Sequence, residues 1–179
     1  MMSRGDKRQT NIENETCKKR IQKMNKRYLT TTLILLVTLF TLTLPVQALA
    51  EMVSIVGNNV NMRSGPGTKY KVIWKLGNGF PLKVLKRSGN WLRVRDFEGT
   101  IGWVHKNVVR KTPHMIVKVH KNTRKRINVR SGPGTNRRIV AKAYYGVVFR
   151  TLKKKDGWVK VSHEKGVTGW VKRSLLWGF

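Results

Sequence analysis

The chain has 179 residues and a formal net charge of +30, from 38 Lys and Arg against 8 Asp and Glu. Its hydrophobic fraction of 40% excludes wholesale disorder, so the length predicts one ordinary domain or two small ones, with a surface that attracts polyanions. The single cysteine, Cys17, precedes the main apolar segment. A structural disulfide, a cysteine-ligated zinc site and a thiol nucleophile are therefore excluded from everything after that segment.

An export signal is predicted near the N-terminus. Basic residues precede an apolar run over 29–44, and the small residues Ala48 and Ala50 follow it. This order is typical of a cleavable secretory signal peptide, with the cut after Ala50 and export to the periplasm or the cell exterior. Residues 1–50 are read as this signal with a poorly ordered basic extension, and Met24 is a candidate for the true start. An uncleaved membrane anchor is the alternative, although the run is shorter than the ~20 residues of a spanning helix.

The rest of the chain contains an internal repeat. The segment Asn61–Thr68 recurs as Asn128–Thr135, an offset of 67 residues. The same offset holds without gaps from Val60–Val109 to Ile127–Leu176. Such self-similarity indicates a duplicated domain. Residues 51–179 carry 29 Lys and Arg against 5 Asp and Glu, so the duplicated part is itself strongly basic at +24.

Each copy consists of short apolar runs separated by turn residues, a pattern typical of an antiparallel β-barrel. We expect an all-β fold with two tandem small SH3-like barrels, over 51–111 and 112–179, and no long helix after Ala50. Asp156-Gly157 predicts a tight hairpin turn in the second copy. The strands expected in the first copy are Met52–Val56, Val60–Met62, Val72–Leu76, Pro81–Lys86, Trp91–Arg95 and Thr100–Val104.

The motif Asn-x-Arg-Ser-Gly-Pro-Gly-Thr, a central Gly, then Trp-x-x-Val and a closing Gly-Trp-Val resembles the bacterial SH3 domain in both copies. The resemblance implies an extracytoplasmic barrel that recognises cell-wall peptides or polymers, usually beside a catalytic domain. No catalytic domain is recognisable in this sequence, which departs from that usual arrangement.

The segment Trp91–Arg95 alternates strictly, so Leu92 and Val94 are expected to face the core while Trp91 and Arg93 face outward. A tryptophan that shares a face with cations is suited to stacking and charge pairing with peptide, sugar or carboxylate ligands. Trp103 and Trp170, in the Gly-Trp-Val segments, are read as structural. The full set of candidate ligand-binding residues is Trp91, Arg93, Arg63 and Tyr70 in the first copy and Trp158, Lys160, Arg130 and Tyr145 in the second.

The two copies differ at some of these positions, so they need not bind the same ligand. Tyr70 is replaced by Arg137, and Gly77-Asn78 by Tyr144-Tyr145. Arg63 and Arg130 flank the Ser-Gly-Pro-Gly turns, which either form a ligand-contacting rim or simply shape the barrel.

No catalytic, metal or cofactor site is predicted. The four histidines share no ligand spacing, and Asp96 and Glu98 are read as solvated turn acids because many cations surround them. No credible Ser/His/Asp set is present, so the sequence predicts a protein that binds and is not an enzyme.

The expected ligand is peptidoglycan or another anionic cell-wall polymer, recognised by its peptides or its charge. The alternative is a periplasmic or extracellular scaffold whose barrels bind a segment of an envelope protein. The basic clusters at 121–126 and 153–155 are surface loops or polyanion contacts, and they predict salt-sensitive nucleic-acid binding in vitro. A membrane partner is expected only if the signal stays uncleaved.

Overall fold

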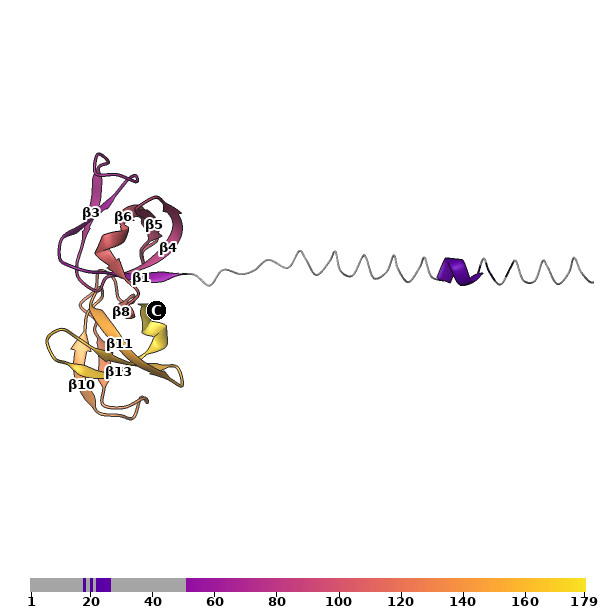
Figure 1. Cartoon of the computed structure of the whole chain (residues 1–179). Coiled ribbons are helices and arrows are strands. Elements are labelled where there is room, and N and C mark those ends of the chain that lie inside the picture. The colour runs from indigo at the N-terminus through magenta and orange to yellow at the C-terminus, as the bar shows by residue number, and fades with distance from the viewer. Residues whose placement is uncertain (1–17, 19, 21, 27–50) are drawn as a thin grey trace, which may run out of the picture. The chain divides into compact units, whose positions relative to one another are not determined.

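The computed structural model describes residues 18, 20, 22–26 and 51–179 (Figure 1). It divides the chain into two compact units, 1–47 and 48–179. Residues 18, 20 and 22–26 are helical. The apolar run 29–44 and the predicted cleavage site after Ala50 lie outside the described residues. None of the helices described has the length and hydropathy needed to cross a membrane.

The first repeat forms a seven-stranded antiparallel sheet in the order β3-β2-β6-β5-β4-β1-β7. A 3-10 turn, η1 (Lys106–Val108), precedes its last strand. The strands are β1 Met52–Ile55, β2 Val60–Arg63, β3 Val72–Leu76, β4 Pro81–Ser88, β5 Trp91–Arg95, β6 Ile101–His105 and β7 Val109–Arg110.

The second repeat forms the same sheet in the order β10-β9-β13-β12-β11-β8-β14. Its 3-10 turn, η2 (Arg173–Leu175), again precedes the last strand, which lies beside β8 (Figure 1). The strands are β8 His114–Val117, β9 Ile127–Arg130, β10 Ile139–Ala143, β11 Val148–Lys155, β12 Trp158–Ser162, β13 Thr168–Lys172 and β14 Leu176–Gly178. The predicted all-β fold with two tandem barrels is confirmed.

Period-two alternation explains where the cores lie. Leu92 and Val94 are buried while Arg93 and Arg95 are exposed, as the sequence predicts. Val159 and Val161 repeat the arrangement in β12. Each barrel has a separate cluster of buried aliphatic side chains. The first contains Val53, Ile55, Met62, Leu76, Leu82, Leu92, Val94, Val104 and Val109, and the second contains their counterparts around Met115, Val129, Phe149, Val171 and Leu176.

The expected strands agree with the structure to within two residues at each end, and β3 and β5 have the predicted bounds. The predicted hairpin at Asp156-Gly157 is confirmed by positive φ angles of 46° and 76°, as a type I′ turn requires. The short strands β7 and β14 and the two 3-10 turns were not predicted. A strand of two or three residues shows no readable alternation, and each becomes a strand only by pairing with β1 or β8.

The segment that joins the barrels is held by both of them. The buried Ser54 Oγ donates a hydrogen bond to the carbonyl oxygen of Thr112 at 2.8 Å. On the other side, the amide of Thr151 donates to the carbonyl oxygen of Pro113 at 2.8 Å. The connection is therefore anchored at two consecutive residues and does not act as a free linker.

Aromatic rings also join the two barrels. The ring of Phe97, after β5, lies 5.9 Å from that of Phe80 in its own barrel and 5.3 Å from that of Tyr145 in the second barrel, measured between centroids. Close by, a Cβ on Gly79 would come within 2.8 Å of the His114 ring. The barrels therefore meet at a contact too tight for a side chain at position 79.

Candidate functional site

The outer face of the β5–β6 ribbon alternates aromatic rings with cations. Trp91 lies opposite His105, and Arg93 lies opposite Trp103. The Trp91 and His105 rings meet edge to face with 5.3 Å between their centroids. The tryptophans are half-buried and Arg93 is exposed, so the ribbon presents ring surface and positive charge together.

The β12–β13 ribbon of the second barrel repeats this alternation. Trp158 lies opposite Lys172, and Lys160 lies opposite Trp170. Cross-strand neighbours on one face have Cβ atoms about 5 Å apart, so a single ligand can touch a ring and a cation at once. The tryptophans and the central cation occupy the same positions in both copies, and only His105 is replaced, by Lys172. We call these two faces the ribbon surfaces.

A groove of about 230 Å³ lies beside Trp158 in the second barrel. Arg130, Trp158 and Lys172 line it, so the structure brings together two residues that the sequence nominated and one that it did not. Lys160 lies on the same ribbon surface. The remaining lining residues are His120, Arg126, Ile127, Asn128, Thr135 and Leu175.

The two motif arginines also serve the fold. Arg63 Nη1 donates to the carbonyl oxygens of Thr68 and Tyr70, both at 2.8 Å. Arg130 Nη1 donates to the carbonyl oxygen of Arg137 at 2.7 Å. Each guanidinium therefore closes the Ser-Gly-Pro-Gly loop of its own repeat, and its remaining N–H groups are what it can offer to a ligand.

The contacts of the two candidate tyrosines, Tyr70 and Tyr145, lie outside the ribbon surfaces. Tyr70 covers Gly65, where a Cβ would come within 2.6 Å of its ring carbons, so this glycine lets the ring lie on the loop. Tyr145 contacts Phe97 and donates a hydrogen bond to Glu98, both in the first barrel. Its place is at the contact between barrels. Whether any nominated residue binds a ligand stays a prediction.

The ribbon surfaces also contain two residues that the sequence did not name as candidates for binding. Trp103 and Trp170, read there as structural, are half-buried on the outer face, since the neighbouring glycines face the core. A Cβ on Gly102 would lie 2.6 Å from Met62 Cγ and 3.0 Å from the Arg63 carbonyl oxygen. Period-two alternation from the buried Val104 would have placed Trp103 outward.

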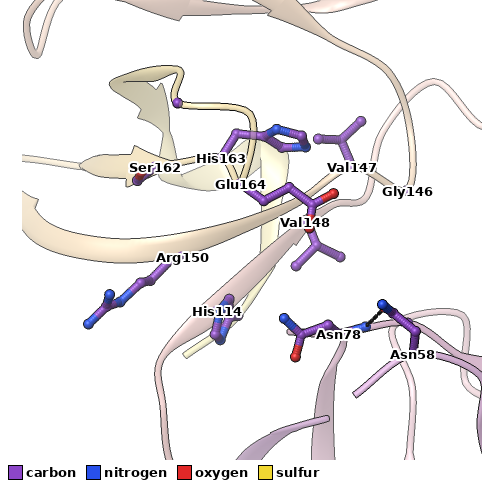
Figure 2. Close-up of a pocket in the computed structure, with 12 residues that line it drawn as sticks. Asn58, Asn78, His114, Gly146, Val147, Val148, Arg150, Ser162, His163 and Glu164 are labelled. Atoms are coloured by element: carbon purple, nitrogen blue, oxygen red, sulfur yellow. Dashed lines mark hydrogen bonds between the residues drawn. The ribbon is translucent and has the colours of Figure 1, made fainter. Parts of the chain in front are cut away.

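A larger groove, of about 690 Å³, lies where the two barrels meet (Figure 2). Asn58, Gly77 and Asn78 line it from the first barrel, and the second contributes residues around His114, 146–150 and 162–166. Burial, with a smaller effect of the Arg150 charge, lowers the pKa of His114 below its usual value of 6.5. His114 Nδ1 lies 3.1 Å from the Thr112 carbonyl oxygen. Because a carbonyl can only accept, Nδ1 carries the proton in the neutral ring.

The model for the bacterial SH3 domain matches residues 56–111 and 123–178, which together make up more than half of the chain. The chain belongs to the bacterial SH3 domain family. Each matched segment contains six of the seven strands of one sheet, and only β1 and β8 lie outside the matches. The resemblance read from the repeated motif is confirmed.

Curated relatives carry names of cell-wall enzymes. A Bacillus subtilis protein named as the N-acetylmuramoyl-L-alanine amidase YrvJ is 29% identical over 161 residues, which cover 86% of this chain and 31% of that protein. A Staphylococcus epidermidis protein named as the cell wall amidase LytH is 40% identical over 47 residues, which cover 26% of this chain and 16% of that protein. The chain thus spans less than a third of the length of the relatives it matches.

Among solved structures, an NlpC/P60 family protein from Bacillus cereus aligns with a TM-score of 0.33 and 12% identity, covering 71% of this chain and 56% of that chain. The prediction that the protein is not an enzyme is contradicted by the curated relatives, which are named as amidases. That prediction weighed only nucleophiles and bases visible in the repeats. Because the match covers only 31% and 16% of the two relatives, missing nucleophiles in the matched region do not argue against a hydrolase.

Proposed function

We propose that the protein acts in cell-wall hydrolysis and that its two SH3 domains bind the wall polymer through the ribbon surfaces. The observation that carries the proposal is the alternation of tryptophan and cation on the same face of both repeats. The names of the amidase relatives support a cell-wall substrate. Export through the predicted signal, with cleavage after Ala50, is part of the same proposal.

The chemistry of the ribbon surfaces fits a polymer of sugars and peptides. A tryptophan ring offers a flat apolar face to a sugar ring or an apolar side chain, while its neighbouring cation pairs with a carboxylate or phosphate. The groove beside Trp158 joins these elements, because Arg130 and Lys172 line it with the ring. A ligand that fits there buries ring surface and has a negative group between two cations.

In this proposal the net charge provides long-range attraction, and the tryptophans provide selectivity for the ligand. Residues 51–179 have a net charge of +24, and this field attracts every polyanion. Long-range attraction of this kind is screened at physiological salt, where the Debye length is about 8 Å. Contacts that bury a half-exposed tryptophan are much less salt-sensitive. A specific wall site therefore keeps its binding at a salt concentration that removes the general attraction.

Co-sedimentation of the purified protein with isolated cell-wall sacculi across a salt series tests the proposal. We expect retention at moderate salt that falls at least about tenfold in Trp158→Ala, because truncating a central aromatic anchor costs roughly 2 kcal/mol or more. Retention should also fall in Lys172→Ala, which removes a cation that lines the same groove. Trp74→Ala and Lys75→Ala are matched controls, since both residues are exposed on β3, which is not a strand of either ribbon surface. Circular dichroism verifies that each variant is folded.

The proposal would be wrong if all four variants were retained equally at low salt and all binding were lost at moderate salt. The charge would then be a general polyanion surface, and the scaffold alternative would be favoured if an envelope protein co-elutes with the chain. Mass spectrometry of the mature protein tests the export proposal separately. A mature chain that begins at Glu51 supports cleavage after Ala50, and an intact N-terminus in the membrane fraction contradicts it.

A further inference from the structure

The groove between the barrels has a wall of oriented amide donors. The backbone amide of Gly57 donates to Asn78 Oδ1 at 3.2 Å, and the amide of Asn78 donates to Asn58 Oδ1 at 3.3 Å. Backbone N–H groups can only donate, so both side-chain oxygens are fixed as acceptors and both Nδ2 groups remain as donors. Since both asparagines line the groove, the first barrel offers it NH₂ groups suited to carbonyl and carboxylate oxygens (Figure 2).

The second barrel contributes two opposite charges that do not neutralise each other. Arg150 and Glu164 both line the groove, and within residues 51–179 neither has an ion-pair partner. Figure 2 shows the guanidinium of Arg150 pointing away from the carboxylate of Glu164. Among the acids of residues 51–179, Glu51 and Glu98 have cationic partners, whereas Glu164 keeps its charge free for a ligand.

His163 adds one more directed group beside Glu164. The backbone amide of Lys165 donates to His163 Nδ1 at 3.1 Å, so in the neutral ring the proton is on Nε2. The ring also packs edge to face on the core residue Phe149, with 5.7 Å between centroids. The imidazole is thereby held in place on the groove wall, with Nε2 left as a donor.

We propose that this groove is a second binding site, for a short peptide with a free carboxylate and a free amine. Arg150 pairs with the carboxylate, Glu164 with the ammonium group, and the asparagine amides with peptide carbonyls. Its volume of about 690 Å³ is in the range of pockets that enclose small ligands. The inference rests on the proposed function in one respect: peptides of the cell wall are the source of such a ligand.

The position of the groove couples the ligand to the arrangement of the barrels. Its asparagines belong to one barrel and its charged residues to the other. A peptide that touches both walls binds only when the barrels are docked, and by mass action it stabilises that state. The site therefore differs from the ribbon surfaces, each of which lies within one barrel.

Titration of the purified protein with trialanine, followed by NMR, tests the inference. N-acetyl-trialanine lacks the amine and trialanine amide lacks the carboxylate, so the three peptides separate the two charge contacts. We expect trialanine to bind at least about tenfold more tightly than either blocked form, with shifts at the amides of residues 146–148 and 162–166. Each contact of a peptide charge with an unpaired side chain supplies about 1.4 kcal/mol for that factor.

Charge-removing variants give the sharper result. Glu164→Gln should bind trialanine and its N-acetyl form equally, and Arg150→Gln should bind trialanine and its amide equally. Asp156→Asn and Arg138→Gln are the matched controls, since both positions are exposed and outside the groove. They should keep the wild-type preference for trialanine.

Two results would overturn the inference: no binding of trialanine at millimolar concentration, or equal binding of all three peptides. Neither result touches the proposed function, whose readout is retention on sacculi that depends on Trp158. Conversely, peptide binding that depends on Arg150 and Glu164 in a protein that does not sediment with sacculi would uphold the groove as a peptide site and remove its connection to the wall.

Discussion

The ring of Phe97 in the first SH3 domain lies against the ring of Tyr145 in the second, with 5.3 Å between their centroids. The next residue, Glu98, accepts hydrogen bonds from the Tyr145 hydroxyl and from Lys121 Nζ. Lys121, followed by Tyr145, lowers the pKa of Glu98, and burial together with Glu98 raises the pKa of Tyr145. Two consecutive residues of the first domain thus hold the second by both an apolar and a polar contact.

Removing the aromatic contact should loosen the docking of the domains. We expect Phe97→Ala to lower the free energy of unfolding by about 1–3 kcal/mol, because it loses stacking on two rings together with buried area. Denaturation with guanidinium, followed by tryptophan fluorescence, measures the change. Leu85→Ala is the control, since Leu85 is 40% exposed and its truncation should cost little. Equal stabilities of the two variants would contradict a docking role for Phe97.

The repeat offers a matched pair of glycines at the same position in the two domains. Gly79 and Gly146 have φ angles of 75° and 79°, so alanine at either position carries a similar strain of about 1–2 kcal/mol. A Cβ at 79 would also lie 2.8 Å from the His114 ring, whereas a Cβ at 146 has no atom within 4 Å.

We therefore expect Gly79→Ala to be the more destabilising substitution, by at least about 1 kcal/mol, because overpacking is added to the same backbone strain. Thermal denaturation of the two variants gives the difference directly. If Gly146→Ala were as unstable as Gly79→Ala, the contact between domains would accommodate the extra Cβ at position 79 without loss of stability.

We expect Arg63, in the repeated motif, to have a structural role and Arg93, on the ribbon surface, to have a binding role. Arg63 closes its loop by hydrogen bonds to Thr68 and Tyr70, and the exposed Arg93 has no such bonds. Arg63→Ala should lower the free energy of unfolding by about 1 kcal/mol, the usual net contribution of such hydrogen bonds. Arg93→Ala should leave stability unchanged and weaken binding to sacculi. The opposite assignment of the two effects would refute this division.

Stability should fall as the pH is lowered, in two separate windows. The pKa of His114 is depressed in the folded state, so its contribution is complete above its ordinary value of 6.5 and is lost as the pH falls below that value. Glu98 behaves in the same direction below its ordinary value of 4.5, since its folded pKa is also lowered.

Urea denaturation between pH 8 and pH 3 measures both windows. His114→Gln should flatten the upper window and keep the lower one, and Glu98→Gln should do the reverse. Each variant is thus the control for the other. A single transition shared by both variants would show that other groups dominate the dependence on pH.

Much of each barrel could be read from the sequence. The bounds of β3 and β5, the buried faces of β5 and β12 and the turn at Asp156-Gly157 all follow from local rules of alternation and turn chemistry. The duplication strengthened every one of these predictions, because the same pattern occurs twice at one offset. The closing strands β7 and β14 escaped prediction because they exist only through pairing with distant strands.

For the candidate sites too, the positions of some residues follow from the sequence and those of others only from the tertiary structure. The sequence by itself determined that Trp91 and Trp158 share an outward face with cations, since period two requires no partner strand. Only the tertiary structure placed Tyr145 against Phe97 rather than on an open surface, and only it formed the groove with Asn58 and Asn78 on one side and Glu164 on the other. The physical reason is the separation along the chain of the residues involved. Alternation acts between neighbouring residues, whereas the docking of two barrels depends on contacts between residues about fifty to a hundred positions apart. No local pattern encodes such contacts.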